Sequence, residues 1–281
     1  MSLIEPTATL PPTHKEALRR AVHQLEGRDF AGRLADFAGQ PVARALRMMP
    51  KPASWGINKV VEIAVLNCLN LAIRSIEPRS KRPPARHASS MLAGLTGGVS
   101  GFFGIAALPL ELPVTTTLML RAIADIARHH GEDLSTLEAR LACVEVFALG
   151  TSNCGQSAHF GYYASRAFLN QLTADTSALF LERGVANVSV PVVGGVVAEI
   201  AARYGVVVSE RAAASALPVI GALGGATVNM LFMNHFQRVA QGHFMVRRLE
   251  RQYGRGVVRE LYEEFSSRRT AAAAQFPVRS Q

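Results

Sequence analysis

Cysteine is scarce in this chain, and the common catalytic and metal-binding signatures are missing. The three cysteines, Cys68, Cys143 and Cys154, are odd in number and irregularly spaced. This pattern predicts neither a disulfide framework nor a zinc site, and it favours a reducing compartment, the cytoplasm. The sequence has no His-Glu-x-x-His, no phosphate-cradling Gly-x-x-x-x-Gly-Lys and no Gly-x-Ser-x-Gly. We therefore expect no metal and no cofactor, and the sequence assigns no catalytic residue.

Aromatic and charged residues are few, whereas apolar residues are plentiful. Aromatics make up 7% of the 281 residues and charged residues 18%, against 49% hydrophobic residues. Alternating strand patterns are almost absent, so the sequence predicts an all-α protein with densely packed helices. The first twelve residues contain Glu5 and no apolar core of signal-peptide length, so we expect no secretion by that route.

Lysine occurs only four times, so arginine supplies most of the formal net charge of +9. Such a charge suits nucleic acid or an anionic membrane surface. The densest basic segment has no aromatic residue that could stack on bases, so we expect no nucleic-acid partner. Near anionic headgroups each cation would contribute roughly 1 kcal/mol; a solvated linker is the alternative. The cations of this segment are Arg79, Lys81, Arg82 and Arg86.

Two stretches, residues 88–110 and 212–236, carry no formal charge and are rich in glycine. A glycine inside a helix costs about 1 kcal/mol relative to alanine, so several in one helix imply a gain from close backbone approach. Glycines four residues apart line one helix face, and this spacing predicts tight helix packing or insertion in lipid. The packing glycines are Gly94, Gly97, Gly98, Gly101, Gly104, Gly221, Gly224 and Gly225.

Proline and glycine divide the chain into predicted segments. We expect an N-terminal helical region over residues 1–77, a basic proline-rich linker over 78–87, a helical core over 88–270 and a disordered tail over 271–281. The fold class is a compact multi-helix bundle with two glycine-rich apolar hairpin segments. The expected helices are 13–26, 31–48, 55–76, 114–130, 135–150, 158–183, 190–204, 209–223, 226–253 and 255–269.

Two local signals refine these boundaries. Thr13, followed three residues later by Glu16, predicts a capping box at the first helix. Pro109 and Pro113 flank Glu111, and this arrangement predicts a sharp bend or a re-entrant corner, because proline lacks a donor and clashes with the preceding turn.

An internal repeat at an offset of 74 residues relates 123–150 to 197–224. Each copy is expected to form a helix, a glycine stop and a second, small-residue helix that begins at a serine cap. A true duplication predicts a pseudo-twofold arrangement in which Asp125 and Glu199 are equivalent; chance similarity in an alanine-rich chain is the alternative.

Several of these residues, taken in order, resemble the EcsC family over about residues 55–262. The resemblance rests on the glycines of the first run, the Leu-Glu-Leu-Pro corner at 110–113, and Leu-Arg-Ala-Ile-Ala-Asp at 120–125. It continues with Pro-Val-Ile-Gly-Ala-Leu-Gly-Gly at 218–225 and Gly-His-Phe at 242–244. Many relatives have an aspartate where this chain has Glu111.

The resemblance implies a helical bacterial protein that acts near membranes, since the family is named after a protein encoded beside the subunits of an ABC exporter. It implies no established catalytic activity. We therefore expect a membrane-associated, non-enzymatic accessory whose partners are membrane lipids or an integral membrane complex such as an ABC exporter. A soluble carrier of an apolar ligand is one alternative. A lipid-directed hydrolase built around Glu111, Asp125, Glu199 and His243 is the other.

Two polar groups are candidates for a site. Asp125 and Glu199 would meet near the centre of the repeat, or each would form an ordinary exposed ion pair worth about 0.2–0.5 kcal/mol. His243, Arg247 and Glu250 share a helix face by their spacing, which could support acid–base chemistry or phosphate binding. In the alternative, structural interpretation, His243 is hydrogen-bonded in a packed interface and Arg247 pairs with Glu250.

Overall fold

The computed structural model describes residues 10–27, 30, 32–33, 60–67, 108–151, 161–171, 190–216 and 225–275. Within these ranges the regular elements are all α-helices, so the predicted all-α bundle is confirmed. The labelled helices are α1 (Pro12–Leu25), α6 (Leu108–His129), α7 (Leu137–Leu149), α9 (Val190–Ala216), α11 (Gly225–Tyr253) and α12 (Arg255–Gln275). Residues 60–67 and 162–171 are helical as well.

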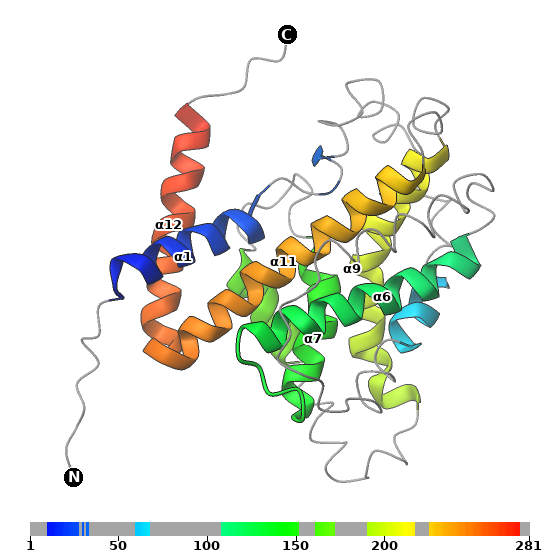
Figure 1. The fold of residues 1–281 in the computed structure, drawn as a ribbon, viewed down its shortest axis with the longest axis horizontal. Helices are drawn as coiled ribbons and strands as arrows, with labels where there is room; N and C mark the ends of the chain where they lie inside the picture. The colour runs from blue at the N-terminus through cyan, green and yellow to red at the C-terminus, as the bar shows by residue number, and fades with distance from the viewer. Residues whose placement is uncertain are drawn as a thin grey trace.

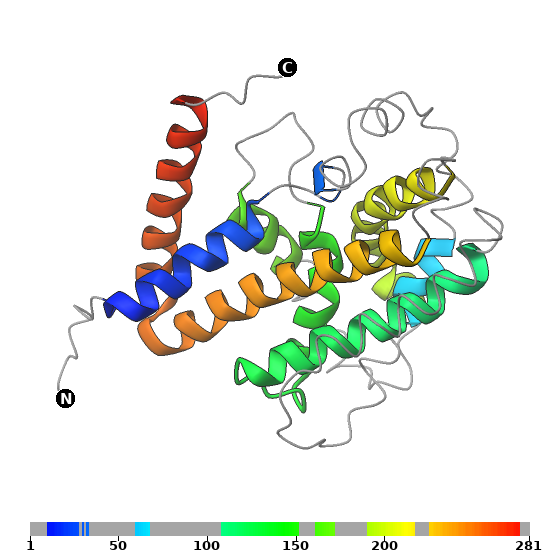
Figure 2. The ribbon, with the colours of Figure 1, turned by 45° about the horizontal axis from the view of Figure 1, so that its top comes forward.

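Helix α11 is the central element of the molecule. It runs across the full width of the ribbon and packs against α1, α6, α7, α9 and α12 (Figure 1). Helix α1 lies antiparallel alongside the C-terminal half of α11 (Figure 2). Helix α12 turns away from the end of α11 after Gly254, whose φ of 85° favours glycine. Because α11 contacts nearly every neighbour, side chains along it can join the surrounding helices into one core.

The core includes a cluster of rings contributed by three helices. Phe147 of α7, Tyr204 of α9 and Phe236 of α11 contact one another, with ring centroids 4.9 to 5.6 Å apart. Phe232 packs against both Tyr204 and Phe236. All four rings are fully buried, and each such side chain contributes about 1.5–3 kcal/mol on burial.

The chain ends that lead into the two glycine-rich runs lie on one side of the molecule. The N-terminal ends of α6 and α11 and the C-terminal end of α9 are all on the right in both views (Figures 1 and 2). The C-terminal ends of α6 and α11 lie toward the opposite side.

The first helix begins differently from its prediction. Helix α1 starts at Pro12 with Pro11 as the N-cap residue, and no side chain caps it, so the capping box of Thr13 and Glu16 is wrong. Proline suits the first helical position because its fixed φ fits the helix and its missing N–H would have no partner there.

The predicted corner at residues 108–113 is also wrong. Helix α6 begins at Leu108 and runs through Pro113. Pro109 lies in the first turn, where the N–H groups lack intrahelical partners. Pro113 lies one turn further on and costs the helix one backbone hydrogen bond. The side chain of Thr117 donates to the Pro113 carbonyl over 2.8 Å, and that of Thr116 donates to the Leu112 carbonyl over 2.6 Å.

The helices predicted at 190–204 and 209–223 form a single helix, α9, as far as Ala216. Gly131 does end α6, with a φ of 80°, but its repeat equivalent Gly205 is buried inside α9. The equivalent helix–stop–helix structure in the second copy is therefore wrong. Burial of Tyr204, Val207 and Val208 outweighs the roughly 1 kcal/mol that the glycine costs.

Helix α12 extends to Gln275, beyond its predicted end at 269, because alanine is the best helix former. The start of the predicted disordered tail is thus helical. Several predictions fall outside the described residues: the linker 78–87 with its four cations, and the glycines at 94, 97, 98, 101, 104, 221 and 224. Gly225 is the first residue of α11.

Candidate functional site

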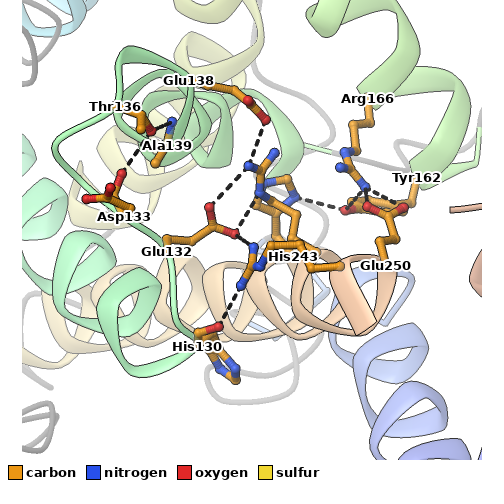
Figure 3. A network of polar contacts seen from close by, with 12 residues as sticks. His130, Glu132, Asp133, Thr136, Glu138, Ala139, Tyr162, Arg166, His243 and Glu250 are labelled. Carbon is orange, nitrogen blue, oxygen red and sulfur yellow. Dashed lines mark hydrogen bonds and ion pairs between the residues drawn. The ribbon is translucent and has the colours of Figure 1, made fainter. Parts of the chain in front are cut away.

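A hollow of about 420 Å³ opens where the α6–α7 connector meets the C-terminal part of α11 and the helix 162–171. The connector is placed by Gly131, which ends α6, and by Thr136, whose hydroxyl caps α7 by accepting from the Ala139 amide over 3.3 Å. Charged side chains dominate the lining (Figure 3). The lining residues are Gly131, Glu132, Asp133, Thr136, Glu138, Arg166, Arg247, Glu250 and Arg251.

Glu132 is the counter-ion of two arginines from α11. Arg247 donates to both its carboxylate oxygens, with Nε–Oε1 at 2.9 Å and Nη2–Oε2 at 3.1 Å. Arg251 donates to Oε1 as well, and its Nη2 donates to the His130 carbonyl over 2.7 Å. The connector is therefore held to α11 by a bidentate ion pair and a second arginine, a geometry stronger than an ordinary surface pair.

A second ion pair lies beside the first one. Arg166 contacts Glu250 with Nη1–Oε2 at 2.8 Å, and both side chains are buried. The hydroxyl of Tyr163 also donates to Glu250, over 2.9 Å. This pair joins the helix 162–171 to α11 and leaves Glu250 well supplied with donors.

His243 is connected to the second ion pair through Tyr162. Arg166 Nη1 donates to the Tyr162 hydroxyl over 3.3 Å, which leaves the phenol proton for His243 Nδ1, 2.9 Å away (Figure 3). His243 is completely buried, and its Nε2 has no hydrogen-bond partner. A histidine so enclosed is a packing residue of the core rather than an accessible base.

The charge states follow from burial and from these partners. Burial opposes ionisation of Glu132, but the hydrogen bonds and charges of Arg247 and Arg251 outweigh it and lower the pKa of its carboxyl. Burial, aided by the charges of Arg166 and Arg247, lowers the pKa of His243 well below its usual range. Burial raises the pKa of Tyr162, so this phenol keeps its proton. At neutral pH the site therefore contains ionised carboxylates and arginines around a neutral histidine.

The predicted polar residues separate into two groups. His243, Arg247 and Glu250 all lie at this site, but Arg247 pairs with Glu132 and Glu138 and Glu250 pairs with Arg166. The alternative pairing of Arg247 with Glu250 is therefore wrong. Arg247 therefore binds the α6–α7 connector and α7, and Glu250 binds the helix 162–171. Side chains on these neighbouring elements are better placed than an i,i+3 partner on the same helix.

Asp125 and Glu199 each form a local ion pair. Asp125 contacts Arg128, three residues later, over 3.0 Å on the exposed side of α6. Glu199 contacts Arg203 over 2.5 Å on α9, as the i,i+4 spacing predicts. The side chain of Glu111 lies outside the described residues.

No sequence motif predicts Glu132, Arg166, Arg251 or Tyr162 as residues of this site. One local signal was present for Arg251, which follows Arg247 by four residues and so shares its helix face. Glu132 and the pair Tyr162 and Arg166 carry no such signal. They reach the site through the path of the connector and the docking of the helix 162–171.

Fold and site together define an all-helical protein in which buried ion pairs tie a connector and a short helix to one long central helix. A model of the EcsC protein family matches residues 67–249, more than half of the chain, and the chain belongs to this family. Glu132, Arg166 and Arg247 lie within the matched range, and Glu250 and Arg251 lie just beyond it. The comparison with curated proteins and that with solved structures found no match.

Proposed function

We propose that this protein is a membrane-associated, non-enzymatic accessory of the EcsC type, which serves an export or envelope process by contacting lipid or an integral membrane protein. The contact surface in this proposal is the end of the molecule where the uncharged runs 88–110 and 212–236 join the helical body, and the basic segment 78–87 meets anionic headgroups.

The observation that carries the proposal is the placement of the helix ends that adjoin these runs. The first run leads directly into the start of α6, and the second includes the end of α9 and the start of α11. Those three helix ends lie on the same side of the molecule (Figures 1 and 2). Two stretches without formal charge, more than 100 residues apart in sequence, are thereby attached to one end of the fold.

Exposed apolar side chains near this end give further support. Val114 lies in the second turn of α6, Met230 in the second turn of α11, and Ile63 in the helix 60–67; all three are exposed large hydrophobic residues. The charged hollow lies near the other end of α11. Arg247 follows Gly225 by 22 residues, or about 33 Å along a helix that rises 1.5 Å per residue. These three side chains and the charged hollow thus lie toward opposite ends of α11, while two further exposed apolar side chains, Phe168 and Val206, lie on the helix 162–171 and on α9. Exposed apolar surface of this kind is typical of interaction sites.

Over the described ranges, none of the helices combines the length and the apolarity needed to cross a bilayer.

Vesicle flotation of the full-length protein tests the proposal. We expect flotation with vesicles that contain anionic lipid, and weaker flotation for the double variant Arg82→Glu/Arg86→Glu. A matched control is Arg248→Glu/Arg255→Glu, which makes the same change in net charge at two exposed residues near the other end of α11. Equal flotation of both variants would remove the role of the basic segment.

A protein that stays entirely in the supernatant at low salt would contradict membrane association. Retention of a lipid or another apolar molecule by that soluble protein, detected by native mass spectrometry, would favour the carrier alternative. The hydrolase alternative requires Glu111, Asp125, Glu199 and His243 around one cavity. The described contacts place Asp125 and Glu199 in separate ion pairs and His243 in the core.

A further inference from the structure

The two carboxylates that contact Arg247 differ sharply in exposure. The side chain of Glu132 is 4% exposed, whereas that of Glu138 is 81% exposed and contacts Arg247 Nη2 at 3.0 Å (Figure 3). Exposed ion pairs contribute little to stability, because water and salt compete for both partners. Glu132 is thus a fixed counter-ion, while Glu138 can leave Arg247 at small cost.

The arginines around the hollow have donor capacity beyond the contacts described above. A guanidinium carries five N–H donors, and the contacts of Arg247 use Nε and Nη2 but not Nη1. Arg166 lines the hollow at 5% exposure, and its buried Nε has no hydrogen-bond partner. Thr136, the N-cap residue of α7, lines the hollow, so the N-terminus of this helix adds a partial positive charge beside it.

The other carboxylates that line the hollow already have hydrogen-bond or ion-pair partners. Glu250 binds Arg166 and Tyr163, and Asp133 accepts from the Ser135 amide over 2.9 Å. Asp133 is exposed and opposes an incoming anion, so the hollow favours a compact group of low charge over a polyanion. Once Glu138 moves aside, its place on Arg247 is open to another oxyanion of similar shape.

From this geometry we propose that the hollow binds a small soluble oxyanion, a phosphate or a carboxylate, and that Glu138 occupies the place of that oxyanion on Arg247 when no ligand is bound. Arg247 and Arg251 hold the oxyanion, and Glu132 keeps both guanidiniums oriented toward it. Because the hollow lies about 30 Å from the glycine-rich end along α11, we assign it to a solute rather than to a lipid headgroup. The proposal does not depend on the membrane association proposed above.

Calorimetric titration of the full-length protein with inorganic phosphate and with malonate tests the assignment, with chloride at equal ionic strength as the reference. We expect saturable binding of at least one of the two probes. Glu138→Gln should bind that probe about two- to fivefold more tightly, because the competing carboxylate is gone. Arg251→Gln should bind it at least about tenfold more weakly, because a charged donor is lost.

Matched controls separate this effect from a change in net charge or in folding. Glu264→Gln removes an exposed carboxylate from the Arg268–Glu264 pair on α12 and should leave the affinity unchanged. Circular dichroism and melting curves of Arg251→Gln show whether it folds, and the exposed Glu138 variant keeps the test valid if it does not.

Three outcomes of the titrations would overturn the assignment. They are the absence of saturable binding of both probes in the wild type and in Glu138→Gln, an affinity that Glu138→Gln leaves unchanged or weakens, and an equal gain of affinity in Glu264→Gln. Glu138-dependent binding to anionic vesicles without binding of the soluble probes would also overturn it in favour of a headgroup. Flotation that is lost only on changing Arg82 and Arg86 concerns the other end and leaves this proposal intact.

Discussion

Leu25 of α1 lies directly over Gly242 of α11. A Cβ placed on Gly242 would be 2.7 Å from the Leu25 Cγ and 3.1 Å from the Ala21 carbonyl oxygen, so the two helices meet where one of them has no side chain. The same contact region includes His14 and Tyr253, whose ring nitrogen and hydroxyl are 2.7 Å apart. Close backbone approach at a glycine thus occurs in this fold, at a position that the predicted packing glycines did not include.

Substitution of Gly242 by leucine should destabilise the protein by about 1–3 kcal/mol, because neither the Leu25 side chain nor the α1 backbone can move freely. Urea denaturation followed by circular dichroism measures the change. Gly256→Leu is the matched control, since nothing lies within 4 Å of a Cβ at that helical position. Equal destabilisation of both variants would argue against a tight α1–α11 contact.

Replacing Glu132 by glutamine should destabilise the fold by about 3 kcal/mol at pH 7, because Arg247 loses its buried counter-ion. The contribution of Glu132 depends on pH with a defined sign. Its folded-state pKa lies below the ordinary value of 4.5, so its stabilisation is present above about pH 4.5 and is lost as the pH falls through the lowered pKa.

Denaturation curves of the wild type and Glu132→Gln at pH 7 and pH 3 check this prediction. The difference between their free energies of unfolding should shrink on acidification. A difference that stays constant over this range would show that the carboxylate charge is not what stabilises the connector.

His235 should make the protein less stable in mild acid. Burial lowers the pKa of this histidine from 6.5 to about 4, and its Nε2 donates to the Gly150 carbonyl over 2.7 Å. Below pH 6.5 the unfolded chain therefore binds a proton at this histidine, whereas the folded protein stays neutral there down to about pH 4. This group alone lowers the free energy of unfolding by about 2 kcal/mol at pH 5 relative to pH 7.

The variant His235→Gln keeps an N–H donor and removes the titration. Its loss of stability between pH 7 and pH 5 should be smaller than that of the wild type by about 2 kcal/mol, as measured by urea denaturation at the two pH values. Parallel losses in both proteins would mean that His235 is protonated in the folded state at pH 5 or contributes nothing.

The predicted close packing at the glycines of the uncharged runs can be tested by substitution, although Gly98 and Gly221 lie outside the described residues. Gly98→Leu and Gly221→Leu should each destabilise the protein by more than about 2 kcal/mol if helices approach closely at these positions. Thermal melting of both variants beside Gly256→Leu measures the effect. Unchanged melting of both would remove the proposed close packing of the glycine-rich end.

The long periodic helices were predictable, whereas two of their boundaries were not. Helix α11 starts within one residue of its predicted start and ends at the predicted residue, because a long apolar stripe is followed by Gly254 in a left-handed conformation. The sequence predicts breaks at Gly205 and Pro113, but both residues lie inside helices. Their local cost is smaller than the gain from the surrounding packing, and that gain is not visible in a single stretch of sequence.

By itself the sequence determined the helical class, the amphipathic face that carries His243, Arg247 and Glu250, and the two uncharged runs, because these depend on composition and on a 3.6-residue period. Only the tertiary structure decided which partners the charges take. Glu132 pairs with Arg247, 115 residues away along the chain, and Arg166 pairs with Glu250, 84 residues away. The path of the connector and the docking of the helix 162–171 bring these partners together. Each buried charge pairs with the opposite charge that the fold brings nearest to it. The local spacing of residues in the sequence does not predict that partner.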